Sequence, residues 1–236
     1  MLYPLTFEPI FQERVWGGRR LETLFNKLLP PGQRIGESWE ISDRPDAISV
    51  IANGPFAGHD LRWLMENHTD ELLGEVPNHD GSFPWLAKLL DANEDLSVQV
   101  HPPASLAEKL GGEPKTEIWH IAHAEPDARL IAGLKRGTTS DNFEARLGQS
   151  DVPLCLHEIP AHNGDSIFIP SGRLHALGAG TVVFEIQQNS DTTFRVFDWN
   201  RTGLDGQPRT LHVDKAIQSI DFTDIEPSVL KPNWDS

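Results

Sequence analysis

Short segments in which apolar residues alternate with polar ones, or fill a brief run, dominate the chain after residue 84. They span residues 85–90, 96–101, 118–122, 128–134, 154–159, 166–169, 181–187 and 193–197. β-Branched and aromatic residues are common in them, and Pro, Gly or Asp lies beside most of them, which is typical of β-strands. Strands of this length and spacing predict a β-sandwich or jelly roll.

Two helices are expected to interrupt these strands. The first follows a Pro pair at 102–103, runs to Leu110 and ends at a Gly pair, in line with the preference for Pro at the start of a helix and Gly after its end. The second spans residues 140–147, with Ser140 as a suitable capping residue. The pattern therefore predicts a mainly β chain with a few short helices.

The first third of the chain has a mixed pattern. Residues 38–42 and 47–52 predict two strands around a turn at 43–46. Asp60 is placed to cap a helix, because the apolar residues after it recur at helical spacing. A further short helix is expected at 70–74.

The chain shows no internal repeat and no linker of low complexity, so we expect one domain over residues 1–236. Within it we expect a mixed α/β part at 1–83, a metal-binding barrel core at 84–222 and a loosely structured tail at 223–236. Eighteen prolines and 19 glycines are scattered along the chain, which fits many short elements joined by tight turns.

Charge and composition narrow the classes of partner. The chain carries 35 acidic and 20 basic residues, a formal net charge of −15, and has no Lys- or Arg-rich run. Nucleic-acid binders carry a basic face, so we expect no nucleic-acid partner, and an anionic substrate needs a local basic pocket.

No apolar stretch approaches the ~20 residues that span a bilayer, and the first residues lack the features of a signal peptide. We expect a cytoplasmic protein with no membrane partner, in which the one cysteine, Cys155, is a buried packing residue.

Two pairs of polar residues occupy strand positions that share a face. Gln99 and His101 are two residues apart, so both point away from the face of the valines that alternate with them. Lys115 and Glu117 are related in the same way. Taken alone, each pair also fits an outer face wetted by solvent or held by an ion pair. In a buried site the pKa of Lys115 would be lowered, which would make it an acid–base group.

A third motif is more specific than either pair. From Gly164 to His175 the chain has the spacing G-x5-P-x-G-x2-H, with Pro170 and Gly172 at the turn. This spacing resembles the second conserved motif of the cupin superfamily, in which the strand after the turn presents the His inward. The cupin motif usually ends in Asn four residues after this His, where this chain has Ala179. We expect His175 to be a metal ligand at the mouth of a cupin-type jelly-roll β-barrel.

Together Gln99, His101, Glu117 and His175 offer two imidazoles, a carboxylate and an amide. Zinc takes nitrogen and oxygen ligands of this kind and keeps an exchangeable position in catalytic sites. Two His residues and one carboxylate also hold non-haem Fe(II). The ligand types alone leave both metals open.

Several segments of the chain resemble type I mannose-6-phosphate isomerases, and the similarity runs from about residue 3 to about residue 222. They are Gln-Val-His-Pro at 99–102, Lys-Thr-Glu at 115–117, the turn before His175, Trp-Gly-Gly at 16–18, Gly-Glu-Ser-Trp-Glu at 36–40 and Glu-Ile-Gln-Gln-Asn-Ser-Asp-Thr-Thr-Phe-Arg at 185–195. The last three further resemble the short bacterial branch of that family. The resemblance implies one zinc ion per chain, with Gln99, His101, Glu117 and His175 as ligands, and an active-site arginine at Arg195.

The family reaction interconverts mannose 6-phosphate and fructose 6-phosphate, so the resemblance implies an enzyme of carbohydrate metabolism. A proton leaves C2 of the open-chain aldose and returns at C1 through a cis-enediol, which requires an acid–base group and stabilisation of oxyanion character. We expect Lys115 and Arg195 to bind the substrate, Lys115 as a proton shuttle and Arg195 at the enediolate or the phosphate. Asp191 is expected as a third catalytic residue on the same face as Arg195, with a plain turn residue as the alternative.

Two other functions fit parts of this pattern. The ligand set suits another cupin enzyme such as an Fe(II) dioxygenase, although Lys115 and Arg195 argue against that chemistry. A non-catalytic sugar-phosphate sensor would keep the pocket without turnover. Short bacterial family members commonly continue into a second, smaller β domain, so either that domain is dispensable here or the site is more open. The oligomeric state stays open.

Overall fold

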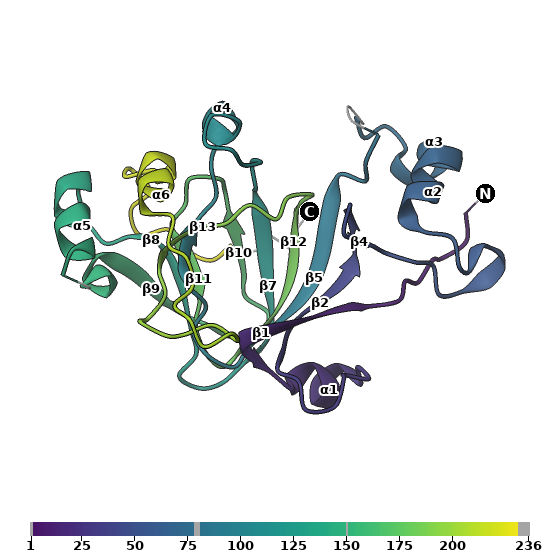
Figure 1. Ribbon diagram of the computed structural model, residues 1–236, viewed down its shortest axis with the longest axis horizontal. Helices are drawn as coiled ribbons and strands as arrows, with labels where there is room; N and C mark the ends of the chain where they lie inside the picture. The colour runs from purple at the N-terminus through teal and green to yellow at the C-terminus, as the bar shows by residue number, and fades with distance from the viewer. Residues whose placement is uncertain (1, 78–80, 150, 231–236) are drawn as a thin grey trace, which may run out of the picture.

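Two antiparallel β-sheets form the body of the protein in the computed structural model, which describes residues 2–77, 81–149 and 151–230 (Figure 1). The six-stranded sheet has the order β1 (Ile10–Gly18), β2 (Ile35–Ile41), β5 (Trp85–Ala92), β12 (Thr181–Gln188), β7 (Glu117–Ala124) and β10 (Ser166–Ile169). The five-stranded sheet has the order β13 (Phe194–Phe197), β6 (Val98–Val100), β11 (His175–Leu177), β8 (Arg129–Leu134) and β9 (Leu156–Pro160). The mainly β, jelly-roll type of fold is therefore confirmed.

The inner faces of the two sheets share one hydrophobic core. Along β12, Val183, Glu185 and Gln187 are buried, whereas Phe184 and Ile186 between them are exposed, as strand alternation requires. The core includes Trp16, Leu90, Trp119, Ile121 and Ile167 from the large sheet and Leu130, Ala132 and Leu177 from the small one. Among the described strands none pairs across the two sheets. The barrel is therefore not closed by hydrogen bonds, and side-chain packing holds the two layers together.

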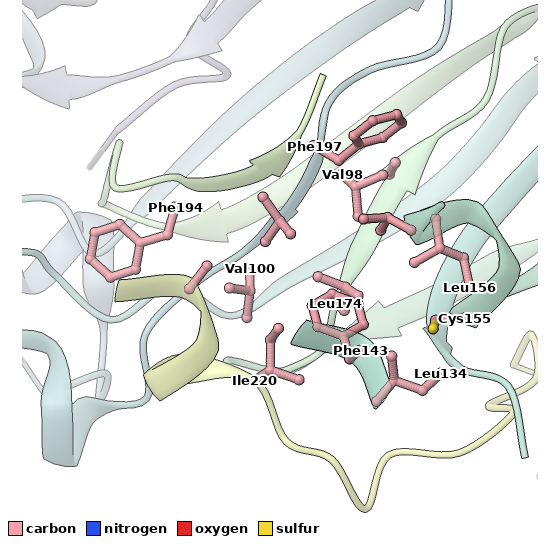
Figure 2. Packing of buried hydrophobic residues seen from close by; sticks show 14 of the residues in the cluster. Val98, Val100, Leu134, Phe143, Cys155, Leu156, Leu174, Phe194, Phe197 and Ile220 are labelled. Atoms are coloured by element: carbon pink, nitrogen blue, oxygen red, sulfur yellow. The ribbon is translucent and has the colours of Figure 1, made fainter. Parts of the chain in front are cut away.

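Helices α5 (Ser140–Leu147) and α6 (Val213–Ser219) belong to a second core on the other face of the five-stranded sheet. Val98 and Val100 of β6 lie in this core with Phe143 of α5 (Figure 2). Cys155 is buried in the same cluster, so its predicted packing role is confirmed. Because both valines belong to this core, the residues that alternate with them along the strand face the six-stranded sheet.

The remaining elements are short helices, turns and one hairpin around the two sheets. They are α1 (Arg20–Phe25), α2 (Leu61–Asn67), α3 (Thr69–Leu73), α4 (Ala104–Ala107), the hairpin β3 (Asp43–Arg44) and β4 (Ala47–Ile48), and the 3-10 turns η1 (Gly54–Phe56) and η2 (Val152–Cys155). α1 packs against β2, β5 and β12. α2 and α3 lie at the opposite end of the molecule from α5 (Figure 1). None of the helices in the described ranges has the length and apolar character needed to cross a membrane.

The helix caps confirm one prediction and correct another. The side chain of Asp60 accepts a hydrogen bond from the backbone N–H of Trp63 at 2.7 Å, so it caps α2 as predicted. Ser140 does not cap α5. Thr139 does so instead, because its backbone is extended and its side chain and that of Asn142 each accept a hydrogen bond from the other's backbone N–H.

Other predicted elements have different bounds in the structure. Alternation did not predict β1, where the pairing with β2 shifts register at Glu13 and so interrupts the period of two. It also did not predict α1 or α6, neither of which has a capping side chain. The expected strand at 154–159 begins only at Leu156, after η2. In the expected loose tail, Ile225 and Leu230 form β-bridges, so the tail is paired up to residue 230, and residues 231–236 lie outside the described residues.

Phe143 offers a direct test of the core behind the five-stranded sheet. Its side chain is fully buried, so Phe143→Ala leaves a cavity and is expected to lower the free energy of unfolding by about 3–5 kcal/mol. Urea unfolding followed by circular dichroism measures this loss. Phe143→Leu keeps most of the apolar volume and should lose clearly less. An alanine variant as stable as the wild type would contradict the packing described here.

Candidate active site

Three buried side chains from both sheets meet at one point. His101 follows β6, His175 begins β11 and Glu117 begins β7. Nε2 of His101 lies 3.4 Å from Oε2 of Glu117, and Nε2 of His175 lies 3.5 Å from Oε1 of the same carboxylate. The potential ligand atoms of the three residues all lie within 4.8 Å of one another. The cluster therefore links the six-stranded sheet to the five-stranded one.

Strand pairing places two further predicted residues beside this cluster. Gln99 on β6 pairs with His175 on β11 and with Arg195 on β13. Directly opposed residues of antiparallel strands have their Cβ atoms about 4.5–5.5 Å apart on one face. Arg195, Gln99 and His175 therefore form a row across three neighbouring strands.

The turn between β10 and β11 explains the Pro-x-Gly part of the sequence motif. Gly172 has a φ of 94°, a backbone conformation that residues with a Cβ rarely adopt. Its backbone N–H donates to the carbonyl of His101 at 2.9 Å. The turn that delivers His175 to the site is therefore bonded directly to the backbone of the other His.

Backbone carbonyls orient both imidazoles. Nδ1 of His101 lies 2.8 Å from the carbonyl oxygen of Thr192, and Nδ1 of His175 lies 2.8 Å from that of Arg173. A carbonyl only accepts hydrogen bonds, so each Nδ1 carries the proton and each Nε2 presents a lone pair to the cluster. Metal-ligating histidines are held by this kind of second hydrogen bond.

The protonation states of the cluster suit metal binding. Burial, reinforced by the Lys115 cation, lowers the pKa of His101 to about 3. Burial also lowers the pKa of His175. Burial by itself raises the pKa of Glu117, but the Lys115 cation outweighs it and holds that pKa well below its ordinary value. Two neutral imidazoles and one carboxylate are the forms that ligate metals.

Unpaired atoms in the cluster also fit a metal ion. Nε2 of His101 and Oε1 of Glu117 are buried and have no hydrogen-bond partner among the described residues, although buried polar groups are normally paired. The side-chain Nε2 of Gln99 lies 3.3 Å from Nε2 of His175. A flip of the amide group would place its oxygen at this position in place of the nitrogen. The donor set of these four residues therefore fits zinc, and its two-His, one-carboxylate core also matches Fe(II).

A cavity of about 400 Å³ borders the cluster and brings the predicted site residues together. Gln99, Lys115, Asp191 and Arg195 all line it. Nζ of Lys115 lies 3.0 Å from Oε2 of Glu117. The lining also contains Arg14, Trp16, Glu37, Lys88, Leu90, Leu96, Ser97, Trp119, Leu177, Glu185, Thr193 and Arg209. Five basic and three acidic side chains thus face one space in a chain that is acidic overall.

The predicted lowering of the Lys115 pKa is wrong. Burial by itself lowers this pKa, but the carboxylates of Glu117 and Glu185 outweigh burial and raise it above its ordinary value. The spacing predicts that Lys115 and Glu117 share a face, although β7 begins only at Glu117, and it does not predict that their charged ends meet. Lys115 is therefore a buried ammonium group that pairs with Glu117 at the wall of the cavity.

Asp191 and Arg195 meet at the cavity by a different route from the one predicted. Strand β13 begins only at Phe194, so alternation along a strand does not relate the two residues. Asp191 is exposed and lies in the loop before the strand. Arg195 lies in the strand, and its Nη1 donates to the carbonyl of Thr210 at 2.8 Å.

The inner face of the six-stranded sheet carries a network of charges that was not predicted from the sequence. Nζ of Lys88 lies 3.6 Å from Glu37 and 3.7 Å from Glu185, and sits over the ring of Trp39 at 4.7 Å from its centroid. Arg14 donates to Glu37 at 2.8 Å. A charged residue at an inward position of an apolar strand is the signal that would have identified Lys88 and Glu185.

Comparison with known proteins gives consistent matches. A family model described as the catalytic domain of type I phosphomannose isomerase matches residues 5–113. The chain is 44% identical over 229 residues to a Bacillus subtilis protein named "Probable mannose-6-phosphate isomerase GmuF", covering 96% of the chain and 71% of the relative. It is 38% identical over 236 residues to a mannose-6-phosphate isomerase of Streptococcus mutans, covering 99% and 72%.

Solved structures show the same relationship. The fold matches the crystal structure of a mannose 6-phosphate isomerase from Bacillus subtilis with a TM-score of 0.87 at 37% identity, over 96% of this chain and 71% of that one. A zinc-bound mannose 6-phosphate isomerase, 20% identical, shares the fold with a TM-score of 0.70, over 92% of this chain and 74% of the other.

The buried network around Glu37 predicts a pH dependence of stability. Burial by itself raises the pKa of Glu37, but Lys88 and Arg14 outweigh it and lower that pKa from 4.5 to about 2. The ionised carboxylate therefore stabilises the fold fully above about pH 4.5. This contribution is lost as the pH falls toward 2, at up to ~1.4 kcal/mol per pH unit.

Glu37→Gln cannot ionise, so the difference in unfolding free energy between wild type and variant should narrow as the pH falls from about 6 to about 3. Urea titrations at several pH values in this window measure the difference. A difference that stays constant with pH would show that ionisation of Glu37 does not contribute to stability.

Proposed function

The chain belongs to the type I phosphomannose isomerase family, and we propose that it interconverts mannose 6-phosphate and fructose 6-phosphate with one zinc ion bound by Gln99, His101, Glu117 and His175. One observation carries this proposal. Two neutral imidazoles and a buried carboxylate, with unpaired donor atoms, lie beside a cavity rich in cations. The relatives described above are named as mannose-6-phosphate isomerases, and the chemistry of the cavity fits that substrate.

The cavity suits a small anionic sugar. Its volume of about 400 Å³ lies in the range of small-molecule sites. Its five basic and three acidic side chains give it a positive balance, whereas the whole chain has a net charge of −15. Local cations near low-dielectric walls attract an anion against the field of the rest of the protein. A phosphorylated sugar is therefore favoured over a neutral one.

Zinc is proposed because the nitrogen and oxygen donors fit it and because a zinc-bound mannose 6-phosphate isomerase shares this fold. When bound, zinc supplies Lewis-acid polarisation of the sugar oxygens and a template for them. The protein holds the ligands ready through the backbone bonds to both Nδ1 atoms.

Lys115 and Arg195 are proposed to act directly on the substrate. In the aldose-to-ketose direction, O1 gains a proton and O2 loses one, while the C2 proton is replaced by one at C1. The ammonium of Lys115 gives the first of these oxygen protons and then takes the second. Arg195, in the row beside Gln99, stabilises the negative charge that develops on the oxygens of the enediolate. Asp191 at the cavity edge accepts hydrogen bonds from the sugar hydroxyls.

Removal and return of the metal tests the proposed reaction. Mannose 6-phosphate isomerisation is expected in the zinc-loaded protein, to be lost after chelation and to return with added zinc, while circular dichroism shows that the chain stays folded. Metal content is measured in parallel by mass spectrometry. A folded, zinc-loaded protein without isomerase activity would refute the proposal. Oxygen consumption with bound iron would support a dioxygenase in its place, and saturable binding without turnover a sensor.

Lys115→Ala separates catalysis from metal binding. The substitution should lower turnover by about 10²–10⁴-fold, the usual contribution of a positioned acid–base group, while zinc content falls far less because Lys115 donates no lone pair to the metal. Lys135→Ala removes an exposed lysine outside the cavity and serves as the control. Equal losses of turnover and zinc in Lys115→Ala would make Lys115 a structural residue.

A further inference from the structure

We propose that Arg209 binds the phosphate group of the substrate and that Asp198 holds its guanidinium in position. This inference rests on the proposed function, because it assumes that a sugar phosphate enters the cavity. It assigns the phosphate end of the site to a residue in the loop between β13 and α6, outside the strands that carry the metal ligands and Lys115.

Arg209 borders the same cavity as Gln99 and Arg195 and is held by a buried carboxylate. Asp198, only 5% exposed, accepts hydrogen bonds from Nε of Arg209 at 2.7 Å and from its Nη2. This leaves Nη1 of Arg209 without a hydrogen bond to any described residue. Arginine held rigidly in this way is well suited to phosphate, because its planar group offers several directed N–H donors.

The charges around Asp198 are not balanced within the protein. Arg201 and Arg209 both pair with this one carboxylate, Arg201 also lies 3.9 Å from Glu94, and Arg195 lies close enough for the charge of Arg209 to act on it, so three cations face two carboxylates. Burial first, and then the Arg209 cation, lowers the pKa of Arg195. Several guanidinium groups near one carboxylate repel each other unless a further anion is present. A phosphate dianion in the cavity would offset this repulsion.

The two cavity arginines are placed for different ends of the substrate. Arg195 pairs directly with Gln99, so its backbone lies in the strand row that leads to the metal cluster, where C1 and C2 must react, while its Nη1 donates to the carbonyl of Thr210. The phosphate is on C6, four carbons beyond C2, and needs a cation farther from the cluster. Arg209 comes from outside the strand row that contains Arg195, Gln99 and His175, yet it lines the same cavity. This division gives Arg195 the reacting oxygens and Arg209 the phosphate.

Binding and kinetics of Arg209→Met test the assignment. Calorimetric titration of the zinc-loaded full chain with mannose 6-phosphate should give a Kd raised on the order of 10- to 100-fold, the effect of losing a charge-assisted hydrogen bond. The KM should rise by a similar factor while kcat changes much less, because Arg209 is proposed to contact the phosphate and not the reacting carbons. Inorganic phosphate, as a competitor of mannose 6-phosphate, should lose affinity in the same variant.

Three further variants make the test specific. Arg209→Lys keeps the charge but not the paired bonds to Asp198, and Asp198→Asn keeps Arg209 but loosens it, so both should give intermediate values of KM. Arg136→Met removes an equal charge from a side chain that is 82% exposed, and should bind mannose 6-phosphate as the wild type does. Thermal unfolding of each variant shows whether it folds. If Arg209→Met does not fold, the binding and kinetic comparison is made with Arg209→Lys.

The outcomes separate this inference from the proposed function. Unchanged affinity of Arg209→Met for both mannose 6-phosphate and inorganic phosphate would overturn the assignment of Arg209, even in an active isomerase. A wild type that binds phosphate through Arg209 but does not isomerise mannose 6-phosphate would refute the proposed function and support the phosphate site. Equal loss of kcat and zinc content in Arg209→Met would also overturn the assignment of Arg209 to the phosphate, because the residue would then act on the metal centre.

Discussion

Burial of the Glu117 carboxylate between the two sheets is the constraint on which the rest of the site depends. A charged group removed from water is costly unless polar and charged partners surround it. Here an ammonium group lies 3.0 Å away, and two imidazoles face the carboxylate with their Nδ1 protons engaged elsewhere. The ammonium group of Lys115 offsets the charge, and the two imidazoles reach the carboxylate from the other sheet, so this cluster also defines where one layer lies relative to the other.

The short strand β6 connects this polar centre to the hydrophobic core. Val98 and Val100 pack with α5, α6 and their neighbours, whereas Gln99 between them points to the cavity and His101 follows on the same side. A strand of three residues has few hydrogen bonds of its own to fix it. Packing of the valines therefore helps to hold the proposed ligands, in the way that functional sites rely on the supporting structure behind them.

The cavity has a charge distribution that differs from that of the chain as a whole. Lys88 lies between Glu37 and Glu185 on the large sheet, while Arg195 and Arg209 come from β13 and the loop after it. Buried charges of this kind persist where they are paired or where a ligand completes them. The large sheet thus presents balanced pairs, and the opposite side presents unbalanced cations. A molecule with a polar sugar at one end and an anionic group at the other matches this arrangement.

Local patterns in the sequence were enough to predict most of the strands and the residue types of the proposed metal site. A period of two shows which residues share a face, and the fixed spacing before His175 identifies the turn that carries it. Both signals are local, so they need no knowledge of what lies opposite.

How these faces meet depends on the packing of distant segments against one another. Lys88 becomes part of the site because β5 pairs with both β2 and β12, which places it beside Trp39 and Glu185 from distant parts of the chain. The pKa of Lys115 rises because of the distance between its ammonium group and Glu117, which depends on side-chain placement rather than on spacing. Arg209 reaches the cavity through a loop without a periodic pattern. Sequence periodicity shows which way a side chain points, whereas its partners, and hence its chemistry, depend on contacts between segments far apart in the chain.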